Sequence, residues 1–329
     1  MPGRVEVIPF ESEILKNNFL HDPYVRRTGI YLPPGYDETK RYPSVYLLAG
    51  FTGRGTMMLN ESAWDENIQQ RLDRLIETRA IEPMIVILPD AFTKYGGSQY
   101  INSDGTGRYM DYMLELVQWV DKNFRTIPER ERRAVAGKSS GGFGALTLGM
   151  HHPEVFGSVA CHSGDMHFDL CYRADFPPTL TGIKKYGGME KFLETFRDAR
   201  PKKGDWHAIL STVGYAACYS PNTESAWGFD IPFDLETGEW NDAVWARWKA
   251  WDPIELIAKY KKALYSFLVL YLDCGTRDEF NLQFGARTFC SRLRRAGIPY
   301  QHQEFDDGHF DIQYRYDVSL RAFSDAWRA

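Results

Sequence analysis

A serine flanked by glycines stands in the middle of this chain, where an apolar stretch gives way to a helix-forming one. Segment 136–144 reads Ala-Gly-Lys-Ser-Ser-Gly-Gly-Phe-Gly, so Ser139 is the centre of a G-x-S-x-G pattern. At a sharp strand-to-helix turn this pattern exposes the serine hydroxyl, and side chains in place of Gly137 and Gly141 would collide. The pattern therefore predicts that Ser139 is a nucleophile. Because the pattern is short, the alternative is a small-residue junction without chemistry.

A serine nucleophile needs an imidazole to take its proton and a carboxylate to orient that imidazole. In one known chain order the serine comes first, the acid second and the histidine last. Two histidines follow the strand predicted over 266–272, and His309, in a loop, is favoured over His302, inside the last predicted strand. Two aspartates are candidates for the acid. Asp273 ends the strand predicted over 266–272 and suits a turn or cap role. We favour Asp278, which lies five residues later in the loop and can reach a histidine on the neighbouring loop.

Two backbone N–H groups are candidates for an oxyanion hole. The predicted turn places the N–H of Ser140 at the N-terminus of a helix, facing any oxyanion on the substrate. A second donor usually comes from the loop after the third strand, where this chain has Gly50-Phe51-Thr52-Gly53. We therefore predict the N–H of Phe51 as the second donor, and a plain glycine-rich turn is the alternative.

The segment after another predicted strand contains His162, Asp165 and His167. This spacing is too loose for a catalytic zinc site, which needs a cleaner set of ligands, so no metal is predicted. Serine-based acyl transfer also requires no organic cofactor. We predict that Asp165 contacts a polar group of the substrate.

The elements that must position these residues alternate between strands and helices. Strands are predicted over 5–8, 25–32, 44–49, 84–88, 155–161, 266–272 and 299–305, and helices over 66–79, 108–124 and 312–327, among others. The continuous apolar runs are typical of strands buried on both faces. The alternation predicts an α/β fold with a doubly wound, mostly parallel sheet and helices on both faces. Segment 92–106, rich in Gly, Ser, Asn and Tyr, is predicted to be a surface loop.

The alternation stops over 166–260, which contains six of the nine tryptophans. We interpret this stretch as an insertion into a core formed by 1–165 and 261–329. Segments inserted after strand C-termini overhang the crevice where α/β sheets bind ligands. The insertion is therefore predicted to cap Ser139, with most of its aromatic residues packing a small subdomain.

Composition bounds the partners of the protein. The net charge is −5 and there is no basic stripe, so neither nucleic acid nor a membrane surface is an expected partner. Five cysteines in no metal or disulfide spacing look like reduced thiols, and the N-terminus has no apolar leader. We expect a cytoplasmic protein. The sequence leaves open whether the protein is a monomer or a homo-oligomer.

These residues together carry a family resemblance. The chain resembles the esterase D-type esterases of the α/β-hydrolase superfamily, whose members include S-formylglutathione hydrolases, feruloyl and acetyl esterases and mycolyltransferases. The matching segments are 31–36 and 42–50, the elbow with the following residues to 146, 273–280, and 308–310. The resemblance implies an α/β-hydrolase fold, a triad of Ser139, Asp278 and His309, and an oxyanion hole formed by Phe51 and Ser140.

The sequence departs from many relatives at three positions and in one segment. It has Ala49 where many have histidine, Ser140 where many have methionine, and Lys138 where a small or aromatic residue is usual. The compact S-formylglutathione hydrolases lack the tryptophan-rich insertion, which weakens that substrate assignment.

We therefore predict a serine carboxylic-ester hydrolase that forms an acyl-enzyme on a small or medium ester. An acyltransferase using the same triad is one alternative, and a non-enzymatic hydrolase-like binding protein is another. A peptidase is less favoured because nothing indicates a peptide groove.

Overall fold

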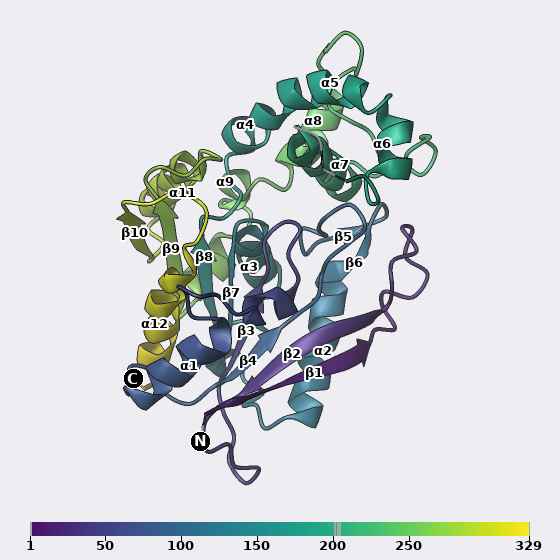
Figure 1. The fold of residues 1–329 in the computed structure, drawn as a ribbon. Helices are drawn as coiled ribbons and strands as arrows, with labels where there is room; N and C mark the ends of the chain where they lie inside the picture. Colours follow the sequence, from purple (N-terminus) through teal and green to yellow (C-terminus); the bar gives the residue numbers. More distant parts are fainter. Residues whose placement is uncertain (1, 201, 203–204, 329) are drawn as a thin grey trace.

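The computed structural model describes residues 2–200, 202 and 205–328. Eight strands form one sheet in the order β1-β2-β4-β3-β7-β8-β9-β10 (Figure 1). The strands are β1 (Arg4–Glu11), β2 (Val25–Leu32), β3 (Ser44–Leu48), β4 (Ile85–Leu88), β7 (Arg133–Lys138), β8 (Ser158–His162), β9 (Val269–Gly275) and β10 (Gln301–Phe305). From β4 to β10 all neighbours are parallel, whereas β1 and β2 join antiparallel at one edge. The α/β-hydrolase fold predicted from the sequence is confirmed.

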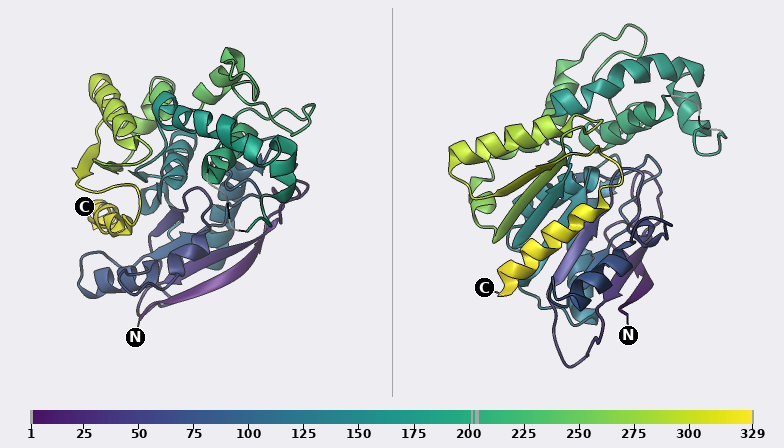
Figure 2. Two further views of the ribbon diagram at one scale, coloured as in Figure 1. Left: turned by 45° about the horizontal axis from the view of Figure 1, so that its top comes forward. Right: turned by 60° about the vertical axis from the view of Figure 1, so that its left-hand side comes forward.

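Helices cover both faces of the sheet, as the apolar runs require (Figure 2). One face packs against α1 (Ile68–Glu77) and α12 (Tyr316–Arg328), and the other against α2 (Tyr109–Asn123), α3 (Ser140–His151) and α11 (Leu282–Ala296). In β3 the side chains of Val45 and Leu47 point to the face covered by α1 and α12. Those of Tyr46 and Leu48 point to the face covered by α2, α3 and α11. All four are fully buried, because successive strand side chains point to opposite faces and both faces are covered.

The polypeptide between β8 and β9 is mostly helical and extends beyond one end of the sheet (Figure 1). It contains α4 (Phe168–Cys171), α5 (Phe176–Lys185), α6 (Met189–Thr195), α7 (Trp206–Tyr219), α8 (Asp242–Lys249), α9 (Pro253–Leu256) and α10 (Lys261–Tyr265). Short 3-10 turns lie at Gly55–Leu59, Arg130–Arg132, Arg173–Asp175 and Gln313–Arg315. In the tryptophan-rich stretch 166–260, which we interpret as an insertion, the Trp248 side chain is fully buried among the rings of Tyr172, Phe176 and Tyr219.

The prediction of a loop over 92–106 holds for most of the segment, but its placement at the surface is wrong. Most of this segment is buried, and with the following residues it forms the hairpin β5 (Asn102–Ser103) and β6 (Gly107–Arg108). The hydroxyl of Ser103 donates to the carbonyl of Ala217 in α7 at 2.8 Å. The segment lies between the sheet and the insertion, so its burial depends on a distant part of the chain that local composition cannot reveal.

Two strands begin three residues later than predicted. Residues 155–157 form the turn after α3, where the Val155 N–H donates to the carbonyl of His152 at 3.0 Å, and β8 starts at Ser158. β9 starts at Val269, because α10 and the turn after it precede it.

None of the described helices is long and apolar enough to cross a membrane. All five cysteines are described, and each is buried as a free thiol.

Candidate active site

Ser139 lies at a strained turn between β7 and α3. Its backbone angles are φ 59° and ψ −129°, a region that residues other than glycine rarely adopt. The strain persists because the surroundings are tight: a Cβ on Gly137 would lie 2.4 Å from the Gly141 backbone, and one on Gly141 would lie 2.2 Å from the Leu48 carbonyl oxygen. The Ser139 N–H donates to the carbonyl of His162 at 2.9 Å. The local geometry is that of a nucleophile elbow.

His309 and Asp278 meet at the same end of the sheet. The Nδ1 atom of His309 lies 2.7 Å from Oδ2 of Asp278, and their side chains are only 3% and 0% exposed. The other carboxylate oxygen of Asp278 accepts the backbone N–H of Phe280 at 2.9 Å. These bonds fix the carboxylate, which in turn orients the imidazole.

Further contacts restrain the His309 ring. The His309 backbone N–H donates to Oε2 of Glu279 at 2.6 Å. The rings of Phe280 and Phe310 stand edge-on to the imidazole, at centroid distances of 4.7 and 5.4 Å. The sequence pattern did not single out these three residues as supports for the histidine.

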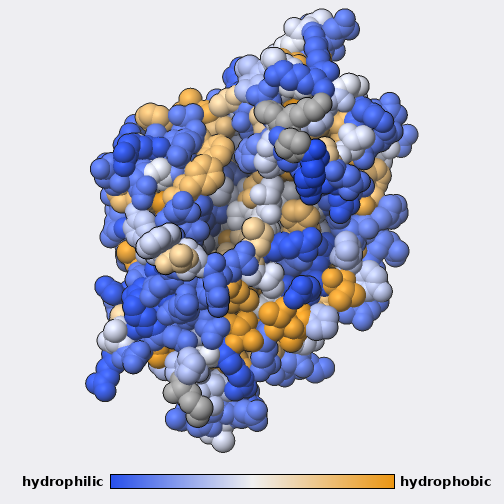
Figure 3. Space-filling view, viewed as in Figure 1, coloured by the Kyte–Doolittle hydropathy of each residue, from blue (hydrophilic) through white to orange (hydrophobic). Residues whose placement is uncertain are grey.

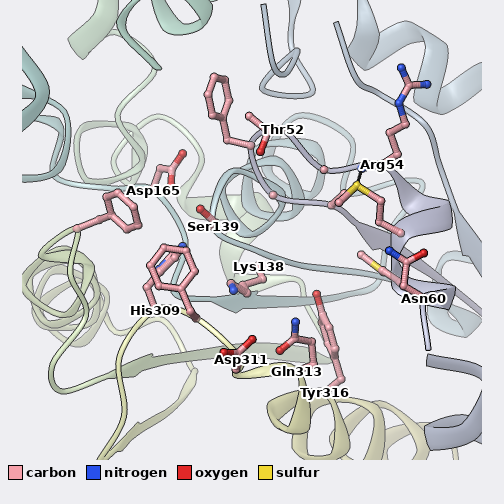
Figure 4. Close-up of a pocket in the computed structure, with 18 of the residues that line it drawn as sticks. Thr52, Arg54, Asn60, Lys138, Ser139, Asp165, His309, Asp311, Gln313 and Tyr316 are labelled. Atoms are coloured by element: carbon pink, nitrogen blue, oxygen red, sulfur yellow. Dashed lines mark hydrogen bonds between the residues drawn. The ribbon is translucent and has the colours of Figure 1, made fainter. Parts of the chain in front are cut away.

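Ser139 and His309 line one pocket of about 660 Å³ (Figure 4). Figure 3 shows this face of the molecule hollowed between the insertion and the sheet. The wall formed by the insertion contributes Tyr172, Asp175, His207, Ser211 and Tyr215, among others, whereas the opposite wall is formed by segments 52–71 and 310–316. Pockets of this size hold small organic ligands.

The loop carrying Phe51 passes directly over the serine. A Cβ on Gly50 would lie 3.2 Å from the Cβ of Ser139, so a glycine is needed for this approach. In the described part of the chain no hydrogen bond occupies the N–H of Phe51 or of Ser140 outside regular secondary structure. The Phe51 ring packs on Tyr215 of α7 at 5.3 Å between centroids, which ties this loop to the insertion.

Asp165 is buried in the pocket wall beside the elbow. Its Oδ2 accepts hydrogen bonds from the hydroxyls of Ser140 and Tyr172, both at 2.9 Å, and from the Gln99 amide at 3.2 Å. Burial raises the pKa of Asp165, and these three donors oppose that rise. No sequence pattern indicates Gln99 or Tyr172, because both reach Asp165 from segments that only the tertiary fold brings together.

Asp175 and Lys138 also line the pocket, and neither was predicted as a site residue. Burial raises the pKa of Asp175 to about 6; a hydrogen bond from Ser211 opposes the rise, and the charge of Asp165 adds to it. Burial lowers the pKa of Lys138, while the carboxylates of Asp311, Asp278 and Glu279 oppose that change.

The turn or cap role predicted for Asp273 is wrong. Asp273 lies inside β9 and is fully buried, with Oδ1 2.8 Å from Nδ1 of His162 and Oδ2 2.8 Å from Nε of Arg315. Burial raises the pKa of Asp273, but the nearby His162 and Arg315 outweigh it, so the pKa is lowered. The Nε2 atom of His162 lies 2.9 Å from the hydroxyl of Ser319 in α12.

The side chains of this second Ser-His-Asp set are not accessible to a substrate. Ser319, His162 and Asp273 are each at most 1% exposed, and none of them lines the pocket. We interpret the set as a structural link that joins the ends of β8 and β9 to α12.

Metal-ligand chemistry finds no support at the described residues. Among them, no group of three or more His, Cys, Asp or Glu side chains is arranged to hold a metal ion. Of the loosely spaced candidates, His162 pairs with Asp273 and Asp165 accepts three hydrogen bonds, so their side chains are engaged elsewhere.

Comparison with known proteins identifies the family. The sequence profile of the family described as "Putative esterase" matches residues 25–322. The chain belongs to this esterase family. The family resemblance noted in the sequence is therefore confirmed.

Two curated relatives of this chain are larger proteins. The chain is 27% identical over 299 residues to "Esterase Rv1288" of Mycobacterium tuberculosis, covering 85% of this chain and 52% of the relative. It is 30% identical over 172 residues to an "Endo-1,4-beta-xylanase/feruloyl esterase" of Xylanibacter ruminicola, covering 49% of this chain and 22% of the relative. The esterase chain thus spans about half or less of these relatives.

Solved structures share the fold over nearly the whole chain. A ferulic acid esterase superposes with a TM-score of 0.64 at 20% identity, covering 99% of both chains. The S-formylglutathione hydrolase FrmB of Staphylococcus aureus superposes with a TM-score of 0.58 at 17% identity, also covering 99% of both.

Proposed function

We propose that this esterase hydrolyses a small or medium carboxylic ester through Ser139, His309 and Asp278. The observation that carries the proposal is the 2.7 Å contact between His309 Nδ1 and Asp278 Oδ2, beside a pocket that both Ser139 and His309 line. Asp278 holds the imidazole with its Nε2 free to accept a proton.

The reaction proceeds in two acyl transfers. The Ser139 hydroxyl gives its proton to Nε2 of His309 as its oxygen bonds to the ester carbonyl carbon, and the carbonyl oxygen becomes an oxyanion. The N–H groups of Phe51 and Ser140 stabilise this oxyanion. Breakage of the ester C–O bond, with return of the proton from His309 to the leaving alcohol, gives the acyl-enzyme. Water then repeats the sequence and releases the acid.

The pocket walls indicate which substrates fit. The rings of Phe51, Tyr215 and Phe280 line the pocket, which suits an apolar or aromatic acyl group. A related fungal ferulic acid esterase has been solved in complex with ferulic acid, a compound with such an acyl group. Asp165 uses one carboxylate oxygen for its three donors, and we assign the other to a polar substrate group. The opposite rim carries exposed residues such as Asn60 and Gln313, so water reaches the pocket, which favours hydrolysis over acyl transfer to an alcohol.

Labelling with a fluorophosphonate tests the nucleophile. The wild-type protein should be labelled and should hydrolyse p-nitrophenyl acetate, butyrate or octanoate, or methyl ferulate. Ser139→Ala should lose labelling and lower turnover by on the order of 10³-fold or more, because no other group can form the acyl-enzyme. The buried Ser319→Ala should still be labelled. An unlabelled wild type, or a labelled Ser139→Ala variant, would refute the proposal.

A further inference from the structure

Lys138 is the one residue of the elbow whose charge the proposed mechanism leaves unused. It is the last residue of β7 and directly precedes Ser139. Its side chain is partly buried and lines the pocket below the serine, on the side of His309 and Asp311 (Figure 4).

The ammonium group of Lys138 has no direct partner. Within residues 2–200, 202 and 205–328, its Nζ forms no hydrogen bond and no ion pair within 4.0 Å. The Nζ atom lies over the Phe310 ring, 5.7 Å from its centroid. The two arginines lining the pocket are instead neutralised, Arg54 by Asp90 at 2.9 Å and Arg71 by Asp317. Unlike these two arginines, the half-buried Lys138 forms no direct ion pair with a described carboxylate.

Three carboxylates face Lys138, and none of them pairs with it directly. Asp278 is bonded to the His309 ring at 2.7 Å, and Glu279 accepts the His309 backbone N–H at 2.6 Å. Asp311 is exposed at the rim, where water solvates it. Burial lowers the pKa of Lys138, and all three carboxylates oppose this change. The lysine side chain lines the pocket, where it can meet a charged group of a ligand.

We propose that Lys138 forms a subsite for a carboxylate carried by the ester substrate. The inference rests on the proposed esterase function and narrows its substrate class to esters with a negatively charged group near the scissile bond. One carboxylate matches the single positive charge, and the exposed amide of Gln313 on the same wall can donate a further hydrogen bond. The carboxylate could belong to the acyl or to the alcohol part of the ester, which lie on either side of the same carbonyl carbon.

Two pairs of substrates distinguish these sources. For the alcohol side, 4-acetoxybenzoate is compared with 4-acetoxybenzamide, and for the acyl side, the monophenyl ester of adipic acid is compared with its terminal amide. For each pair the ratio of kcat/KM, carboxylate over amide, is measured for wild type, Lys138→Met and Lys138→Arg. Lys262→Met, which removes an exposed lysine that does not line the pocket, is the matched control.

In one of the two pairs, Lys138→Met should lower the carboxylate-to-amide ratio by about tenfold, the scale of a hydrogen bond to a charged group. Lys138→Arg should retain most of the preference, and Lys262→Met should keep the wild-type ratio. Ratios within about twofold of wild type for Lys138→Met in both pairs would overturn the subsite. Hydrolysis of the amide-bearing esters by wild type reports the esterase function separately; if wild type hydrolyses none of the four esters, the proposed function fails and the subsite with it.

Discussion

Two aspartates of this chain each hold a histidine through its Nδ1 atom, Asp278 with His309 at 2.7 Å and Asp273 with His162 at 2.8 Å. At the scale of single residues these pairs are nearly the same. They differ in what the other ring nitrogen meets, because His309 faces the pocket whereas His162 meets the buried hydroxyl of Ser319. Access to the pocket, rather than hydrogen-bond geometry, separates the candidate triad from the structural link.

Replacement of each aspartate should therefore have a different effect. Asp278→Asn should lower kcat by on the order of 10³–10⁴-fold with little change in melting temperature, because the amide stabilises the wrong imidazole tautomer. Asp273→Asn should mainly lower the melting temperature, because it leaves Arg315 without its buried counter-charge and disturbs the hydrogen bond to His162. Steady-state kinetics and thermal unfolding of both variants check this. A kcat of Asp278→Asn within tenfold of wild type would contradict the role proposed for Asp278.

At the scale of elements, the loop that carries Phe51 and the insertion pack against one another. The Phe51 ring and the buried segment 92–106 fill the space between α7 and the sheet. Within the insertion, the Trp248 indole packs against Trp245 and donates from Nε1 to the hydroxyl of Ser220 at 2.7 Å. Dense aromatic packing thus keeps this wall of the pocket in place.

Trp248→Ala should lower the free energy of unfolding by about 3–5 kcal/mol, the usual result of removing a buried large aromatic side chain. Trp64→Ala is the matched control, because that indole is 93% exposed and its loss should change the free energy by less than about 0.5 kcal/mol. Urea denaturation of the two variants measures the difference. Equal effects of the two substitutions would show that the insertion does not unfold together with the core.

At the scale of the whole molecule, the pocket imposes a dependence of stability on pH. The pKa of Asp175 rises from 3.8 to about 6 on folding, so the folded state binds more protons than the unfolded state between these pH values. By linkage, this group makes the free energy of unfolding fall as the pH rises through that window. Above about pH 6 this cost is complete, because the carboxyl is then ionised in both states.

Asp175→Asn should remove that cost. Relative to wild type, its melting temperature should be higher by about 2 °C more at pH 8 than at pH 4, since the amide does not ionise. Thermal unfolding at both pH values measures the change. The exposed Asp325→Asn serves as the control. A variant that is destabilised more at pH 8 than at pH 4 would contradict the sign of this prediction.

The sequence by itself determined the fold and the candidate residues whose identity follows from local chemistry. Gly137, Ser139 and Gly141 mark the elbow, because a strained turn leaves no room for other residues there. Apolar runs and helix periodicity located the main strands and helices to within a few residues. The chain order selected Asp278 and His309, since both follow strands that end at the same edge of a parallel sheet.

Only the tertiary structure decided which polar residues lie in the core and which face the pocket. Partners far away in the sequence bury Asp273, Gln99 and the rest of segment 92–106. No local pattern could therefore indicate that these residues are buried. The same holds for Lys138: its position beside Ser139 is written in the sequence, but its lack of a direct ion pair depends on where Asp278, Glu279 and Asp311 come to lie. Long-range contacts determine which side chains are buried and which charges are paired. These two properties distinguish a charge with a structural role from one that can bind a substrate.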